Sequence, residues 1–203
     1  MTIDIQPAVR LFGLSGSLRR NSYCRSVLEA LQAILPPDVR LALHEPRLPL
    51  YSEDEDGEAS PHEVRRFRAS IAASDGVVIV TPEYNHSLPG ALKNALDWAS
   101  RPLGAAALTG KPVVVISVSP AFTGGVRAQS HLHDVLLAIR ARIVAGPQIV
   151  IGNIAAKISD GRFVDESSLC FALETIGALL KDVGRGAPAA AAASSHVLEE
   201  GAV

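Results

Sequence analysis

Apolar and polar positions follow a repeating order along this chain: a short apolar run, a turn, then a longer amphipathic stretch. The apolar runs predict strands over Val9–Leu14, Val39–His44, Gly76–Thr81, Pro112–Ser119 and around Ile143–Ile151. Apolar residues at helical spacing predict helices over Ser22–Leu35, His62–Ala73, Pro89–Ser100, Val126–Arg140 and Glu166–Asp182. The acidic stretch YSEDEDGEASP, which begins at Tyr51, has no such period and predicts an exposed loop.

Strands that alternate with helices predict an α/β fold with a parallel sheet. Parallel neighbours need crossover connections, and the helices in these connections pack on both faces of the sheet. In such sheets, ligands bind beyond the carboxyl ends of the strands, near the point where the strand order reverses. The loops after the first, third and fourth predicted strands are therefore the places to look for a site.

Composition and charge narrow the range of functions. The chain has 203 residues, 48% of them hydrophobic, and a formal net charge of −2, so it lacks the basic field that attracts nucleic acid or anionic membrane. No apolar run reaches membrane-helix length, and the opening MTIDIQPAVR has no signal-peptide core, so we expect a cytoplasmic protein. We expect one domain over residues 1–185 and an Ala-rich tail over 186–203. Cys24 and Cys170 match no metal-binding spacing and are predicted to be free thiols.

The loop after the first strand, GLSGSLRRNSYC, combines features that bind phosphate. Hydroxyl groups at Ser15, Ser17 and Ser22 and the positive charge of Arg19 lie just before a predicted helix, whose N-terminus favours anions. The same residues also make an ordinary turn and helix cap, and the loop alone leaves both interpretations open. A GxGxxG dinucleotide fingerprint and a GxSxG nucleophile elbow are both missing here.

The stretch TPEYNHSLPGALKNALDW follows the third strand. Pro82 and Pro89 lower the conformational freedom of the unbound loop, so the loop loses little entropy when it closes on a ligand. Between them, Glu83, Tyr84 and Asn85 offer backbone donors and acceptors and an aromatic face, which suits a flat heterocycle. Each also has a plain structural interpretation: a solvated charge, an aromatic covering a loop, and an Asx turn.

The loop after the fourth strand reads SVSPAFTGGVRAQ. Ser117 ends the strand, and the paired glycines Gly124 and Gly125 let the backbone approach a ring closely, although a plain turn needs the same residues. His131 and His133 follow two positions apart on a predicted helix, so they face different ways. We therefore expect no metal site.

Together the three loops resemble one family, the NADPH-dependent FMN reductases of flavodoxin-like fold, which include bacterial quinone, chromate and azo-dye reductases. GSLRRNS looks like the family's GSxRxxS loop, and TPEYNHSLPGALKNALDW is very similar to its TPEYN-x-S-x-PG-x-LKN-x-x-DW segment. A GG-x-x-x-Q element recurs at Gly124–Gln129. The resemblance runs from Val9 to Gly184 and implies a three-layer sandwich with a five-stranded parallel sheet in the order 2-1-3-4-5.

The resemblance also assigns roles. Ser17, Arg19 and Ser22, with Ser15 as a further candidate, would hold the FMN phosphate, and Pro82, Glu83, Tyr84, Asn85, Ser117, Gly124 and Gly125 would surround the isoalloxazine ring. NADPH, or NADH, would be the co-substrate in a ping-pong reaction with a quinone, chromate or azo acceptor, with no catalytic side chain. The family is commonly dimeric or tetrameric. Cys24 stands where the family often has Asn, and Ala121 where it often has Gly.

Two other functions compete with a reductase. A flavodoxin-like electron carrier would bind flavin without turning over NAD(P)H, but such carriers tend to be strongly acidic, unlike this chain. A hydrolase would use Ser15 or Ser17 as nucleophile, although neither lies in a nucleophile motif. Bleaching of bound flavin by NADPH distinguishes the reductase from the carrier, and labelling by a serine-reactive phosphonate identifies a hydrolase.

Overall fold

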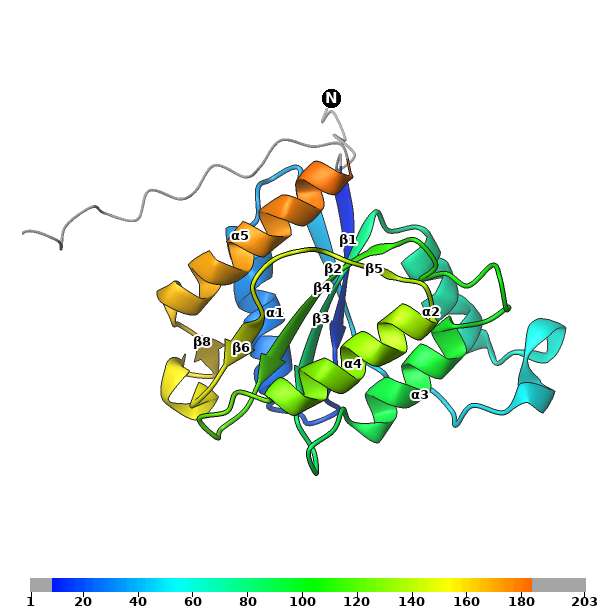
Figure 1. The fold of residues 1–203 in the computed structure, drawn as a ribbon, viewed down its shortest axis with the longest axis horizontal. Helices are drawn as coiled ribbons and strands as arrows, with labels where there is room; N and C mark the ends of the chain where they lie inside the picture. Colours follow the sequence, from blue (N-terminus) through cyan, green and yellow to red (C-terminus); the bar gives the residue numbers. More distant parts are fainter. Residues whose placement is uncertain (1–8, 184–203) are drawn as a thin grey trace, which may run out of the picture.

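A computed structural model describes residues 9–183 and shows a central sheet with helices on both faces (Figure 1). The main strands are β1 (Val9–Ser15), β2 (Val39–His44), β3 (Gly76–Pro82), β4 (Pro112–Val118), β5 (Arg142–Ile143) and β6 (Ile149–Ile151). The helices are α1 (Tyr23–Ile34), α2 (His62–Ala72), α3 (Gly90–Ala99), α4 (Val126–Ala138) and α5 (Glu166–Asp182). The Ala-rich segment 186–203 lies outside the described residues.

The order of the strands confirms the predicted flavodoxin-like topology. Neighbouring strands follow the order β2-β1-β3-β4-β5, and every pair in this sheet is parallel. The chain goes from β1 outward to β2 and then crosses back to β3 on the other side of β1. This reversal makes the carboxyl ends of β1 and β3 the switch point at which such sheets bind ligands.

The fifth position of the sheet differs from the prediction of one strand around Ile143–Ile151. It holds two short strands: β5 pairs with the start of β4, and β6 pairs with its end. Gly146 and Pro147 lie between them, and proline has no N–H to donate to a ladder. The side chain of Gln129 on α4 lies across this interruption, because its Nε2 donates to the carbonyls of Val115 at 3.1 Å and Ile149 at 3.4 Å.

Both faces of the sheet are buried, which explains why its strands read as continuous apolar runs. Val78 and Val80 of β3 belong to the core under α1 and α5, while Val77 and Ile79 belong to the core under α2, α3 and α4. Successive side chains of a strand point to opposite faces, so one strand serves both cores. The helices therefore hold the strand ends, and the loops that leave them, in fixed positions.

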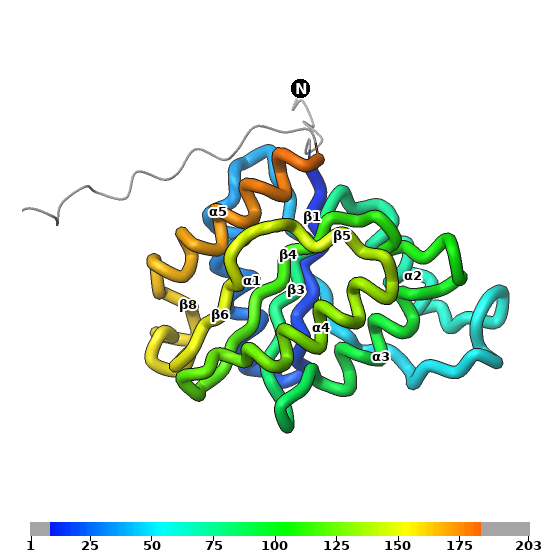
Figure 2. Tube along the Cα trace, in the orientation of Figure 1, coloured from blue at the N-terminus to red at the C-terminus, as the bar shows by residue number. Residues whose placement is uncertain are grey.

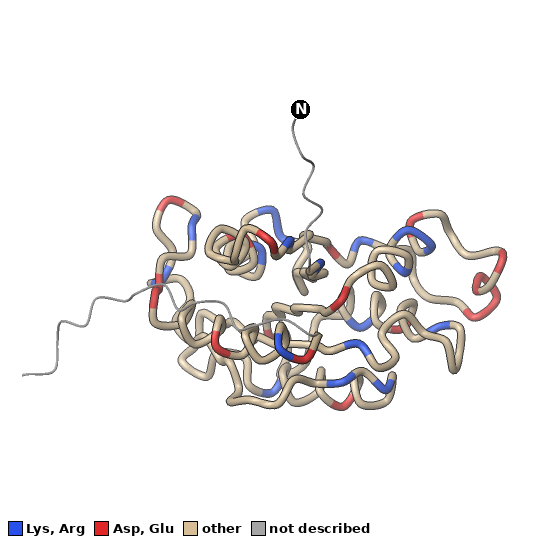
Figure 3. Tube along the Cα trace, turned by 90° about the horizontal axis from the view of Figure 1, so that it is seen from above, with Lys and Arg blue, Asp and Glu red and all other residues tan. Residues whose placement is uncertain are grey.

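Two features lie outside this sandwich. The acidic stretch is an exposed loop, as predicted, with two short 3₁₀ turns, η1 (Glu53–Glu55) and η2 (Gly57–Ala59). Its acidic residues gather on a protruding lobe, while both signs of charge are interspersed over the rest of the trace (Figure 3). A further 3₁₀ turn, η3 (Ile154–Lys157), leads into a small hairpin of β7 (Ile158–Ser159) and β8 (Arg162–Phe163), which the sequence pattern did not predict.

Within residues 9–183, none of the helices combines the length and apolar character needed to cross a membrane. The same part of the chain contains no group of three or more His, Cys, Asp or Glu side chains arranged to hold a metal ion.

Candidate functional site

The loops after β1, β3 and β4 meet at the carboxyl edge of the sheet (Figure 2). Two contacts connect them directly. The N–H of Gly16, just after β1, donates to the carbonyl of Val80 in β3 at 2.7 Å. A Cβ atom placed on Gly125, after β4, would lie 3.5 Å from the Cβ of Glu83, after β3. All the residues predicted for the site therefore lie on one continuous edge.

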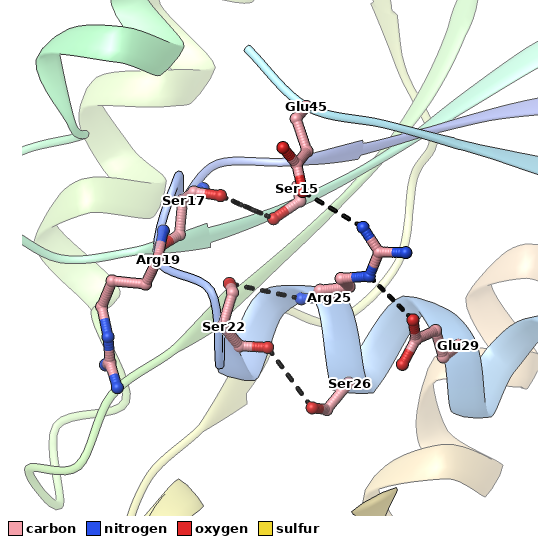
Figure 4. A network of polar contacts seen from close by, with 8 residues as sticks. All are labelled: Ser15, Ser17, Arg19, Ser22, Arg25, Ser26, Glu29 and Glu45. Carbon is pink, nitrogen blue, oxygen red and sulfur yellow. Dashed lines mark hydrogen bonds and ion pairs between the residues drawn. The ribbon is translucent and has the colours of Figure 1, made fainter. Parts of the chain in front are cut away.

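The loop after β1 is organised by its own serines (Figure 4). Ser15, Ser17 and Ser22 are all buried, with 2%, 4% and 3% of their surfaces exposed. The hydroxyl of Ser15 donates to the Ser17 carbonyl at 3.2 Å, and the hydroxyl of Ser17 accepts from the N–H of Arg19 at 3.2 Å. Ser22 is the N-cap of α1, where its hydroxyl accepts from the N–H of Arg25 at 3.4 Å. The loop is thus shaped by local hydrogen bonds that need no ligand.

The backbone of this loop also has the character of an anion site. Gly16 lies so close to β3 that an added Cβ would be 3.0 Å from the Cα of Thr81, so a side chain here would press against the β3 backbone. Within residues 9–183, the N–H groups of Arg20 and Asn21 have no hydrogen-bond acceptor. Unpaired N–H groups ahead of a helix N-terminus are the donors that a phosphate requires.

Arg19 is a cation of this loop that forms no ion pair within residues 9–183. It is exposed, and its guanidinium carbon lies 5.2 Å from the centre of the Tyr23 ring. Arg25, one turn further along, is instead engaged by two carboxylates, Glu29 at 2.8 Å and Glu45 at 3.1 Å. Figure 4 shows Arg19 extending from the loop on its own, apart from these ion pairs.

Cys24, which departs from the resembled motif, has no part in capping α1. The residue is 1% exposed, and burial raises the pKa of its thiol to about 12. A neutral, buried thiol behaves as a small apolar group. Because Ser22 provides the side-chain cap of α1, the replacement of Asn by Cys at this position leaves that cap intact.

The tip of the loop after β3 is a tight turn with fixed geometry. The N–H of Tyr84 donates to the carbonyl of Ser87 at 2.9 Å, and the reverse bond measures 3.0 Å. Asn85 and His86 between them have φ values of 49° and 65°, which is the left-handed pair of a type I′ turn. The turn leaves 46% of Tyr84 exposed beside the site.

Glu83 has a role that the sequence did not reveal. Its side chain is only 14% exposed, and its Oε2 accepts from the backbone N–H groups of Arg127 at 3.1 Å and Ala128 at 3.2 Å. The N-cap position of α4 is Gly125, which has no side chain to perform this function. A helix preceded by Gly-Gly rather than by Ser, Thr, Asp or Asn was the signal that its cap must come from elsewhere.

The loop after β4 brings backbone close to the same edge. Gly124 and Gly125 have φ values of 61° and 85°, and a Cβ on Gly124 would lie 2.3 Å from the Cγ1 of Val150. Ser117 is fully buried, and its hydroxyl has no hydrogen-bond partner within residues 9–183. Phe122, at the outer end of this loop, is 83% exposed.

These residues fit FMN by the chemistry of their donors. Buried serine hydroxyls, unpaired N–H groups and Arg19 suit a phosphate, and the left-handed glycines allow backbone to reach a ring edge. Pro82 and Asn85 lie in the same restrained loop as Tyr84. The two serines that a hydrolase could use have backbone partners instead of a base: Ser15 donates to the Ser17 carbonyl, and Ser17 accepts from the N–H of Arg19.

Comparison with known proteins identifies the family. The sequence profile of one family, described as NADPH-dependent FMN reductase, matches residues 9–156. A quinone reductase of Pseudomonas putida KT2440 is 43% identical over 154 residues, covering 75% of this chain and 83% of that protein. A 2-hydroxy-1,4-benzoquinone reductase of a Burkholderia species is 40% identical over 163 residues, covering 79% of this chain and 88% of that protein.

Solved structures show the same fold. FerB of Paracoccus denitrificans, a flavoenzyme NAD(P)H:acceptor oxidoreductase, superposes with a TM-score of 0.71 at 32% identity. The superposition covers 86% of this chain and 98% of that chain. An NAD(P)H:quinone oxidoreductase of Methanothermobacter marburgensis has a TM-score of 0.60 at 18% identity, covering 86% of this chain and 97% of that chain, and supports the fold alone.

Proposed function

Because the chain belongs to the NADPH-dependent FMN reductase family, an oxidoreductase family with FMN as cofactor and NAD(P)H as co-substrate, we propose that it passes two electrons to a quinone-type acceptor. The balanced reaction takes NAD(P)H, one proton and a quinone to NAD(P)⁺ and a hydroquinone. FMN supplies the redox chemistry when bound. The protein supplies binding, orientation and access.

The observation that carries the choice of acceptor is the open aromatic rim of the site. Tyr84 and Phe122 project from loops held rigid by hydrogen bonds and glycine geometry, yet they are 46% and 83% exposed. Exposed aromatic side chains next to a flavin site favour an acceptor with a planar ring, which can stack against them when it binds. Relatives named quinone reductase support the same class of acceptor.

Binding of the cofactor is assigned to the chain as follows. The hydroxyls of Ser17 and Ser22, the guanidinium of Arg19 and the free N–H groups between them would hold the phosphate, with Ser15 fixing the shape of the loop. Backbone of residues 82–85 and 117–125 would line the ring, beside the turn at Tyr84. Backbone N–H groups at the ring edge would favour negative charge there.

NAD(P)H and the acceptor use the same exposed side of this rim in turn, which is a ping-pong scheme. One exposed rim, at Tyr84 and Phe122, serves both molecules in this scheme. Parallel lines in double-reciprocal plots of initial rate, with NADPH varied at several quinone concentrations, are the expected result. Intersecting lines would replace this scheme with a ternary complex.

One spectroscopic experiment tests the proposed function. Protein loaded with FMN and desalted should retain a flavin spectrum, bleach anaerobically with NADPH and recover on addition of 1,4-benzoquinone. Retained flavin that neither NADPH nor NADH bleaches would establish the electron carrier instead. Chromate and an azo dye, tested in parallel, show whether acceptors other than quinones also reoxidise the flavin.

Association of subunits and a cytoplasmic location remain predictions. Val126 and Leu137 on α4 are 36% and 62% exposed, so two large apolar side chains of this helix lie on the surface. Large exposed apolar side chains mark interaction surfaces when they gather on one element. We expect a homodimer or homotetramer, and light scattering after size-exclusion chromatography measures its mass.

A further inference from the structure

Three basic side chains lie beside the candidate flavin site, where the turn after β3 meets the first turns of α4. Arg127, His86 and His131 are all exposed. Arg127 Nη1 lies 2.6 Å from the Nδ1 of His86, and Ser87 Oγ lies 2.9 Å from the Nδ1 of His131. Arginine can only donate, so Arg127 is the donor in its contact with the His86 imidazole. We call Arg127, His86, Ser87 and His131 the basic corner.

The carboxylate of Glu83, next to the basic corner, is already engaged. Glu83 turns inward, where its Oε2 accepts two backbone N–H groups of α4, and its Oε1 lies 3.5 Å from His86. Within the described part of the chain, the guanidinium of Arg127 forms no ion pair. An exposed guanidinium whose neighbours are imidazoles and a hydroxyl is suited to an arriving anion.

The proposed reaction brings several anions to this edge. The FMN phosphate is assigned to the loop after β1, which has its own cations in Arg19 and Arg20. NADPH and NADH share a diphosphate, and NADPH carries a further phosphate on the 2′-oxygen of its adenosine, which alone distinguishes it from NADH. The nicotinamide is identical in the two molecules, so contacts at the flavin cannot discriminate between them. Discrimination must come from a cation set to one side of the ring.

We propose that the basic corner binds the 2′-phosphate of NADPH, with Arg127 as the residue that sets the preference for NADPH over NADH. The proposal rests on the proposed function, since it assumes that NAD(P)H reaches the flavin from this side. Arg127 provides paired N–H donors, and His86, His131 and Ser87 provide further polar contacts around them. A phosphate dianion gains most from a fork of donors of this kind.

Equilibrium binding tests the proposal without turnover. Calorimetry with FMN-loaded protein should show that adenosine 2′,5′-bisphosphate binds more tightly than adenosine 5′-monophosphate. The Arg127→Ala variant should lose roughly 10- to 100-fold of the affinity for the bisphosphate and little for the monophosphate, as expected for one charge-assisted contact. Arg127→Lys keeps the positive charge but lacks the paired N–H donors of arginine, so its affinity for the bisphosphate should lie between those of the wild type and Arg127→Ala. Arg40→Ala, at an exposed position on β2 far from this edge, is the matched control.

Three results would overturn the proposal: equal affinity for the two nucleotides, a difference that persists in Arg127→Ala, or displacement of the bisphosphate by inorganic phosphate at similar concentration. The last result would make the corner a general anion site.

Kinetics supply a second readout, in which Arg127→Ala lowers the ratio of kcat/KM for NADPH to that for NADH by the same factor. If NADPH does not bleach the wild-type flavin, the proposed function fails, and the calorimetry still decides the binding question. Thermal unfolding of each variant confirms that it is folded.

Discussion

The carboxylate of Glu83 accepts a hydrogen bond from the backbone N–H of Ala128 at 3.2 Å, joining the loop after β3 to the first turn of α4. A second bond from Arg127 N, at 3.1 Å, makes this acid the cap of a helix that has glycine at its own N-cap position. A negative charge at a helix N-terminus also interacts favourably with the helix dipole. One residue therefore stabilises α4 and fixes the separation of two loops of the site.

Replacing Glu83 by Ala should lower both stability and FMN affinity. The variant leaves two helix N–H groups without an acceptor, and loss of a cap costs about 0.5–2 kcal/mol in the free energy of unfolding. FMN affinity should fall as well, because the loops at Tyr84 and Gly125 are no longer held together. Urea unfolding of the apoprotein measures the first effect, and quenching of FMN fluorescence measures the second.

Glu83→Gln is the matched control for this prediction. Its amide keeps an oxygen acceptor for the helix N–H groups but has no charge, so it should lose less stability than the alanine variant. If both variants unfold at the same urea concentration as the wild type, the cap contributes nothing, and the link between the loops must lie elsewhere.

Ser117→Ala separates stability from cofactor binding. Its hydroxyl is buried without a partner in the described structure, so removing it breaks no hydrogen bond and should leave apoprotein stability unchanged or slightly higher. Ser74→Ala is the control, because the Ser74 hydroxyl donates to the Ile71 carbonyl at 2.7 Å. That variant should lose about 1 kcal/mol. A drop in FMN affinity for Ser117→Ala alone would assign its hydroxyl to the flavin, whereas a destabilised apoprotein would contradict the prediction.

Gly124→Ala should be strongly destabilising. The residue has a positive φ of 61°, and an added Cβ would lie 2.3 Å from Val150 Cγ1, so the backbone or β6 must move. Strain and overpacking of this kind cost about 1–3 kcal/mol each. Gly90→Ala, at the start of α3, meets nothing within 4 Å and gains helix propensity, so its thermal midpoint should stay level or rise. Equal midpoints for the two variants would refute the steric argument.

The two thiols should differ sharply in reactivity. A disulfide reagent at pH 8 should modify the exposed Cys170 quickly and Cys24 only after unfolding, because burial raises the pKa of the Cys24 thiol to about 12. Cys170→Ala should then show no reactive thiol in the native state. If two thiols of the native wild-type protein reacted quickly with the reagent, the result would be inconsistent with the buried position of Cys24.

The same thiol makes stability depend on pH on the alkaline side. The folded state holds the proton of Cys24 more tightly than the unfolded chain, so its contribution is complete below pH 9.0 and is lost as the pH rises toward about 12. Cys24→Ala removes this group. Urea unfolding of both proteins between pH 8 and 10.5 should show a stability loss that is steeper in the wild type.

Much of the fold could be predicted from local pattern. Continuous apolar runs identified β1, β3 and β4, because these strands are buried on both faces, and helical spacing located all five helices. The fifth strand was predicted as one element because Ile143 and Ile151 are both apolar. Its division follows from Gly146 and Pro147, and from the amide of Gln129 lying against β4 and β6. A hydrogen bond from another helix leaves no trace in the periodicity of the strand.

The sequence by itself determined the α/β class and the three loops that could form a site, since turn chemistry and motif spacing are local properties. Only the tertiary structure decided what the residues in those loops contact. Glu83 caps a helix that begins more than forty residues later, Arg127 reaches His86, and Ser117 is buried without a partner. These relations join segments far apart along the chain, and the packing of the helices on the sheet sets their distances.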